Sequence, residues 1–155
     1  MSFDEPYFYK TNTSKFNMAN VLDMKDIRYI NLFGQVTRIS TRHCFMYNEA
    51  IVFAVPKHLV SKAIGEGGKN VKRMSIVTKK RIKIIPEPLG IQHAEEFIKA
   101  IVSPVSFNDF EMTDDEIVIT AGSQHKAALL GRNKRRFTEL KEIVWNFFKK
   151  ELRIV

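Results

Sequence analysis

The sequence contains an internal repeat, because residues 51–74 resemble residues 117–140 when the two segments are aligned without a gap. The alignment places AIG at 63–65 on LLG at 129–131. This period is longer than the period of solenoid repeats, in which each unit stacks on the next. In a chain of 155 residues it therefore predicts two small, similar domains.

Each copy of the repeat shows the same succession of elements. The runs 50–55 and 116–121 are rich in β-branched residues and bounded by polar or turn residues, which is typical of strands. Apolar residues at helical spacing follow, and each of these first helices ends at a glycine. The elements expected next are helices at 57–64 and 71–77 with a strand at 81–85 in the first copy, and helices at 123–130 and 137–147 with a strand at 152–155 in the second.

A further helix and strand precede each copy. Residues 22–36 and 91–102 carry apolar side chains at helical spacing, and 43–47 and 105–112 predict strands. Both halves then follow the order helix, strand, strand, helix, turn, helix, strand. The first twenty residues show no clear period, and residues 1–20 are interpreted as an N-terminal tail.

Basic residues gather in the two repeated segments. The net charge of the chain is +8. Between the two repeated segments, however, residues 87–116 contain eight acidic residues and a single lysine or arginine, Lys99. A basic balance alone is also compatible with an acidic membrane surface or with solubility. Two matched basic blocks favour an electrostatic binding footprint for a polyanion.

Several function classes find no support in the sequence. The apolar runs are too short to span a bilayer, and the N-terminus does not read as a secretory signal. A single cysteine, Cys44, is compatible with a reducing cytosol, so a cytoplasmic location is expected. The dispersed histidines form no metal-ligand spacing, and no nucleophile–base pair is evident. We expect no metal, no cofactor, no membrane contact and no enzymatic activity.

The glycine-rich stretch IGEGGKNV at 64–71 lies between the two helices of the first copy. It fits the pattern I-G-x-x-G-x-x-[IV] and resembles the signature loop of KH domains, where a GxxG loop clamps the backbone of a single-stranded nucleic acid. A helix N-terminus offers unpaired N–H groups, and glycines let phosphates approach them closely. A P-loop is excluded because Asn70 stands where Ser or Thr is required. The flanking strands disfavour a helix-turn-helix.

The resemblance extends to the order of the elements. Type II KH domains carry their extra helix and strand before the shared core, and both halves are expected to do so because the last predicted strand finishes the chain. The sequence is similar to the archaeal NusA-like transcription factors, most densely at IRYINLFGQVT, AIGEGGKNVKR and ALLGRN. This resemblance implies an α+β fold of two tandem type II KH domains, at 21–88 and 89–155. In each domain the helices would pack on one face of a three-stranded mixed sheet.

The resemblance also implies the residues that would contact RNA. In the first domain they are Lys62, Ile64, Gly65, Glu66, Gly67, Gly68, Lys69, Asn70, Lys72 and Arg73. In the second domain they are Gly131, Arg132, Asn133, Lys134, Arg135 and Arg136. Two features depart from the family pattern. Glu66 opposes phosphate, and the second loop has lost its last glycine, so its side chains are expected to contribute more than its backbone.

The aromatic residues of the last helix, Trp145, Phe147 and Phe148, are interpreted as packing residues rather than as a base-stacking surface. The function that the resemblance implies is binding of nascent single-stranded RNA, with modulation of transcription termination or elongation. Two alternatives stay open. One is a KH protein of ribosome assembly or RNA processing, and the other is a scaffold that contacts RNA polymerase or ribosomal proteins without binding RNA.

Overall fold

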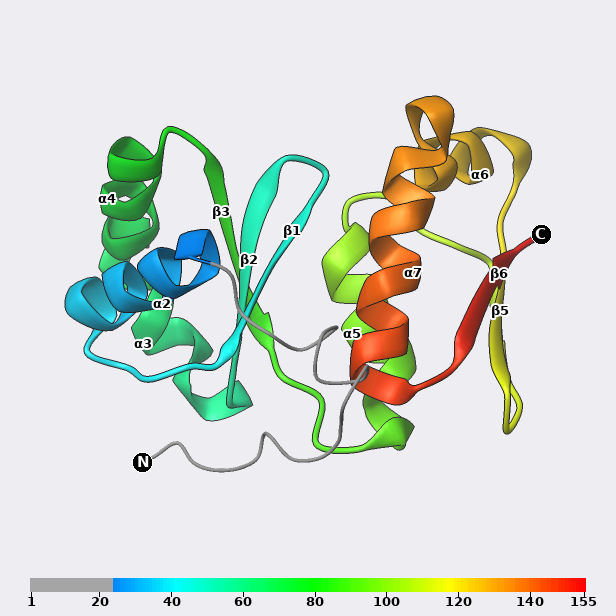
Figure 1. Cartoon of the computed structure of the whole chain (residues 1–155), viewed down its shortest axis with the longest axis horizontal. Helices are drawn as coiled ribbons and strands as arrows, with labels where there is room; N and C mark the ends of the chain where they lie inside the picture. The colour runs from blue at the N-terminus through cyan, green and yellow to red at the C-terminus, as the bar shows by residue number, and fades with distance from the viewer. Residues whose placement is uncertain (1–23) are drawn as a thin grey trace.

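The computed structural model describes residues 24–155, so the tail expected at 1–20 lies outside the described residues. The described chain is α+β, with two three-stranded sheets and helices beside each (Figure 1). None of its helices has the length and apolar character needed to cross a membrane. The first half contains α2 (Met24–Thr37), β1 (His43–Tyr47), β2 (Ala50–Val55), α3 (Val60–Ile64), α4 (Lys69–Thr78) and β3 (Arg81–Pro86). The second half contains α5 (Ala94–Val102), β4 (Asp109–Met112), β5 (Glu116–Thr120), α6 (Ser123–Leu130), α7 (Arg135–Phe148) and β6 (Glu151–Ile154).

The two sheets have the same topology. β1 pairs antiparallel with β2, and β2 pairs parallel with β3. β4, β5 and β6 repeat this arrangement, which confirms the mixed three-stranded sheets expected from the sequence. A parallel pair requires a crossover connection. Here the crossovers are α3 with α4 and α6 with α7, so the glycine loop of each copy lies inside a crossover.

Three predicted elements differ in extent from those observed. One is the helix expected over 91–102, which is divided into a 3-10 turn at Ile91–His93 and α5. The strand expected over 105–112 begins only at Asp109, because Val105 and Phe107 pack against the hydrophobic core from an irregular segment. Their alternating apolar pattern resembles a strand although they do not pair as one. The helix expected over 57–64 is divided into a 3-10 turn at Lys57–Leu59 and the short α3.

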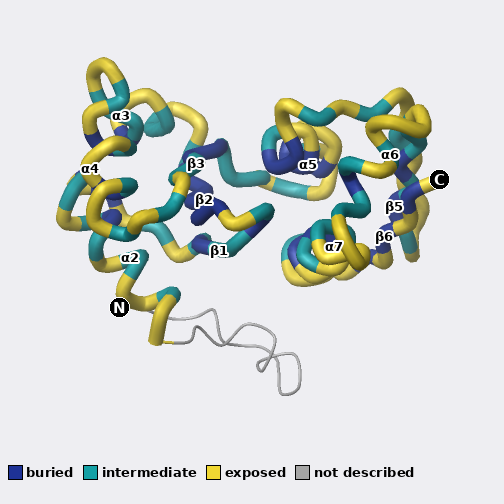
Figure 2. The backbone as a smooth tube through the Cα atoms, turned by 90° about the horizontal axis from the view of Figure 1, so that it is seen from above, coloured by how far each residue is buried: buried dark blue, intermediate teal, exposed yellow. Residues whose placement is uncertain are grey.

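The central strand of the first sheet, β2, is buried along its whole length. Ile51, Phe53 and Val55 join the core formed with α2, α3 and α4. Val52 and Ala54 point to the other face and join the core of the second half, beside α5 and α7. A strand covered on both faces is expected to be apolar throughout, as AIVFAV is. The tube coloured by burial shows β2 in the colour of buried residues (Figure 2).

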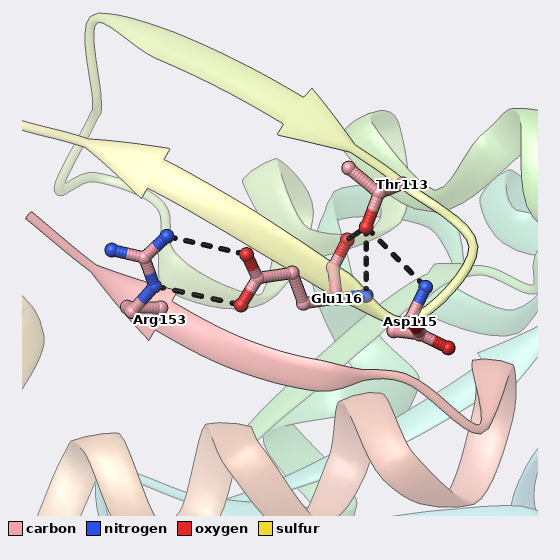
Figure 3. A network of polar contacts seen from close by, with 4 residues as sticks. All are labelled: Thr113, Asp115, Glu116 and Arg153. Atoms are coloured by element: carbon pink, nitrogen blue, oxygen red, sulfur yellow. Dashed lines mark hydrogen bonds and ion pairs between the residues drawn. The ribbon is translucent and has the colours of Figure 1, made fainter.

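The second sheet is covered on one face only. In β5, Ile117 and Ile119 are fully buried, and the residues between and beside them are only partly buried. The open face carries polar contacts, including an ion pair of 3.2 Å between an Arg153 Nη and a Glu116 Oε (Figure 3). Thr113 closes the β4–β5 turn beside this pair, because its hydroxyl accepts hydrogen bonds from the backbone N–H groups of Asp115 and Glu116. The equivalent face of the first sheet is the one that packs against the second half.

Aromatic side chains fill part of the contact between the two halves. Phe147 of α7 lies 4.6 Å from Phe97 of α5 and 5.9 Å from Phe45 of β1, measured between ring centroids. His43 also approaches Phe147, and burial lowers the pKa of this histidine to about 4. Packing was the expected role of the aromatic residues on this helix, and Phe147 fulfils it. Trp145 does not pack in the same way, because 43% of its surface is exposed.

Polar contacts join the halves as well. Lys83 of β3 extends its ammonium group to the C-terminal end of α5, where it donates hydrogen bonds to the carbonyl oxygens of Ile101 at 2.9 Å and Ser103 at 2.8 Å. A cation at this position also complements the helix dipole. The Glu139 carboxylate of α7 accepts a hydrogen bond from the backbone N–H of Asn48 in the β1–β2 turn.

Replacing Lys83 by methionine should lower the free energy of unfolding by about 1–3 kcal/mol, because hydrogen bonds from a charged donor to the helix end are lost. The matched control is Lys57→Met, since Lys57 is exposed and lies in the 3-10 turn that precedes α3. Urea unfolding of both variants measures the difference. Equal stability of the two variants would show that the Lys83 contact contributes nothing to the association of the halves.

Candidate nucleic-acid interface

The first loop connects α3 to α4 with an unusual run of left-handed backbone. The φ angles of Gly65, Gly67 and Gly68 are +84°, +64° and +75°. Only glycine adopts such conformations without steric cost. Lys69 then begins α4, whose N-terminus has no side-chain cap. The loop therefore presents bare backbone and a helix N-terminus to the surface, which together suit an anion.

Asn70 holds the loop from inside. Its side chain is buried, and its amide nitrogen donates hydrogen bonds to the carbonyl oxygens of Ala63 at 3.1 Å and Lys62 at 3.4 Å. These carbonyls belong to the last turn of α3, which has no further helical partner. A Cβ atom on Gly65 would lie 2.9 Å from the Asn70 amide nitrogen, whereas one on Gly67 would meet nothing within 4 Å. Gly65 is thus needed because the Asn70 side chain packs closely against its backbone. The space beside Gly67 is open.

The second loop has the same backbone with different residues. Gly131, Asn133 and Lys134 have φ angles of +74°, +55° and +60° at the positions of the three glycines of the first loop. Arg136 stands at the position of Asn70 and donates a hydrogen bond to the carbonyl oxygen of Ala128 at 3.0 Å. A Cβ on Gly131 would lie 2.8 Å from the Arg136 side chain. The loss of the last glycine therefore leaves the shape of the loop unchanged.

A cleft of about 620 Å³ lies beside the first loop. One wall is the loop with α3 and the first turns of α4, and the other is the C-terminal end of α2. Four cationic side chains line the cleft, and they are Arg38, Lys62, Lys69 and Arg73.

The structure brings the sequence-predicted residues together at two places, one at each loop. Those with exposed side chains or backbone are Lys62, Glu66, Gly67, Lys69, Lys72, Arg73, Arg132, Asn133, Lys134 and Arg135. Those that are partly buried are Ile64, Gly65, Gly68, Gly131 and Arg136. Asn70 is buried, so its contribution to any ligand is through the position of the loop.

Sequence reasoning missed the contribution of α2 to this site. Gln35 and Arg38, at the end of that helix, line the cleft opposite the loop. Arg38 has a φ of +64°, and its backbone N–H bonds to the Gly34 carbonyl, so it lies where the chain leaves the helix. A basic residue just after the predicted helix was visible in the sequence, but only the packing of α2 beside α4 places it near the loop.

The described residues offer no competing metal centre. Over 24–155, no group of three or more His, Cys, Asp or Glu side chains is arranged to hold a metal ion.

Two curated proteins have sequences similar to part of this chain. The chain is 33% identical over 88 residues to a probable transcription termination protein NusA of Methanococcus vannielii, and 30% identical over 93 residues to the protein of that name in Methanocaldococcus jannaschii. Over these segments the chain is similar to two archaeal proteins that carry the name NusA. The matches cover 57% and 59% of this chain and 49% of each relative, so they span about half the length of these proteins.

A solved structure shares the fold. The crystal structure of APE1850 superposes with a TM-score of 0.61 at 20% identity, covering 86% of this chain and 99% of that one. At this identity the likeness concerns the fold. No family model matches the chain.

The close approach at Gly65 predicts a difference between two glycine substitutions. Both Gly65→Ala and Gly67→Ala impose a left-handed φ on alanine, but only the first also brings a Cβ against Asn70. Gly65→Ala should therefore reduce the free energy of unfolding by about 1–3 kcal/mol more than Gly67→Ala, as overpacked sites do. Urea unfolding measures both.

The double variant Gly65→Ala/Asn70→Ala identifies the clashing partner. Because Asn70→Ala removes the obstructing amide as well as its hydrogen bonds, the two substitutions should together cost less than the sum of their separate effects. Strict additivity would mean that the Asn70 side chain contributes nothing to the cost of Gly65→Ala.

Proposed function

We propose that this chain binds single-stranded RNA through its two loops, as a non-catalytic factor of transcription termination or elongation. The observation that carries the proposal is the repeated left-handed loop, with its φ angles reproduced by glycines in one copy and by Asn133 and Lys134 in the other. Left-handed residues other than glycine are uncommon. Their presence at the same two positions suggests that both loops serve one purpose, which a phosphate contact provides.

The two halves are proposed to be tandem type II KH domains, at residues 21–88 and 89–155. The order of elements and the repeated sheet topology support this assignment. In the first domain the phosphate contact comes from bare backbone at Gly67 and Gly68. In the second it comes from the same backbone shape with exposed Arg132, Lys134 and Arg135 around it.

The cellular process is inferred from the relatives. The two archaeal proteins named as probable transcription termination proteins support nascent RNA as the ligand and transcription as its setting. RNA polymerase is the proposed protein partner, and the cytoplasm is the proposed location. The basic character of the chain, with a net charge of +8, supports a polyanionic ligand.

Salt dependence and one double substitution test the RNA contact. The wild-type affinity for short single-stranded RNA should fall with salt concentration, with a log–log slope of about −0.7 for each phosphate contacted. Gly67→Asp/Gly68→Asp should abolish this binding, because two carboxylates would occupy the phosphate position. The fold should persist, since Asn133 and Lys134 occupy the same backbone positions in the second loop. Fluorescence anisotropy and circular dichroism measure the two properties.

The control variant adds the same two negative charges at positions outside the first loop. Asn146→Asp/Gln124→Asp adds two negative charges at exposed positions on α7 and α6. This variant should keep most of the affinity. If both double variants bind equally well, the first loop is not the phosphate site. A wild type with no RNA affinity that nevertheless forms a stable complex with polymerase would make the chain a scaffold.

A further inference from the structure

Glu66 has no evident place in a phosphate site. It stands inside the first loop, exposed, and lines the cleft together with Lys62, Lys69 and Arg73. Among the described residues its carboxylate takes part in no hydrogen bond or ion pair, in spite of these neighbours. The carboxylate and the cations of the cleft are thus all available to a ligand.

The fold of the loop does not require Glu66. The corresponding residue of the second loop is Arg132, and the φ angles that follow are similar in both loops. Glutamate and arginine therefore occupy the same backbone position in the same turn. The backbone of the turn therefore does not require a glutamate at this position.

A ligand that contacts both the cations of the cleft and the Glu66 carboxylate must carry an anionic group and hydrogen-bond donors. The cations and loop amides suit a phosphate, and a carboxylate suits a pair of N–H donors. In single-stranded RNA the Watson–Crick edges of the bases are free for such contacts. Guanine offers its N1–H and N2–H side by side to both carboxylate oxygens. Uracil presents one N–H between two carbonyl oxygens, which a carboxylate repels.

We propose that Glu66 selects a base with an exocyclic amino group, guanine foremost, in a nucleotide whose phosphate lies on the first loop. Gln35 and Arg38 form the opposite wall of the cleft, whose volume of about 620 Å³ is within the usual range of ligand sites. This inference rests on the proposed function, because it assigns a base preference to the same RNA site. Glu66 is then a specificity-determining residue, and the loop backbone and lysines supply the affinity.

Short oligouridines that carry a single guanosine, at successive positions, test the inference at one fixed salt concentration. The wild type should bind the best guanosine-containing oligomer at least about fivefold more tightly than oligouridine, the lower end of the discrimination given by a bidentate base contact. Glu66→Gln should bind oligouridine more tightly than the wild type does, because a negative charge is removed from the phosphate site. It should also lose most of the preference for guanosine.

Two further variants complete the test. Glu66→Arg reproduces the residue of the second loop, so it should fold and should also lose the preference. Glu96→Gln removes the same charge from an exposed position on α5 and should leave both affinity and preference unchanged. If Glu66→Gln raises the affinity for every oligomer by the same factor, or the wild type shows no preference, the inference is wrong while RNA binding stands. Absence of salt-dependent binding to any oligomer would remove the proposed function and this inference together.

Discussion

The strand β2 has apolar side chains on both faces, and each face requires a cover. The helices of its own half cover one face, and α5 and α7 of the other half cover the second. Burial of apolar surface is the main favourable term in folding. This shared strand therefore links the packing of the first half to that of the second. Lys83 and Glu139 add polar contacts to the same boundary.

The two loops of the repeat share a backbone shape but differ in their side chains. Both loops place left-handed residues before a helix, and in both a side chain two residues later bonds to the end of the preceding helix. Asn70 does this in one copy and Arg136 in the other. The backbone is thus held by an internal contact, while the outer residues remain free to differ. Glycines make the first loop bare, and cationic side chains surround the second.

Much of the architecture followed from the sequence. The gap-free repeat and the helical and strand periods gave most elements to within one or two residues, because both copies carried the same pattern. The segment 105–112 was harder, since Val105 and Phe107 alternate as in a strand but pack from a loop. The two-sided cover of β2 was also open to inference, because AIVFAV is apolar throughout while EIVIT begins and ends with polar residues.

The site was less accessible from the sequence than the fold. The GxxG pattern located the loop, but it could not separate the outward residues from Asn70, which is turned inward. It gave no sign of Gln35 and Arg38, because these approach the loop only through the packing of α2 beside α4. Nor does the sequence indicate that Lys134, which replaces the last glycine in the second loop, keeps a left-handed backbone. The placement of Gln35 and Arg38 depends on contacts between segments distant in the sequence.

The central claim is that loop backbone contacts RNA in both halves. Backbone amide chemical shifts during titration with short single-stranded RNA test it most directly. The account predicts that the largest changes fall on the amides of Gly67, Gly68 and Lys69 and on those of Asn133, Lys134 and Arg135. Changes confined to the open face of the second sheet, around Glu116 and Arg153, would contradict it.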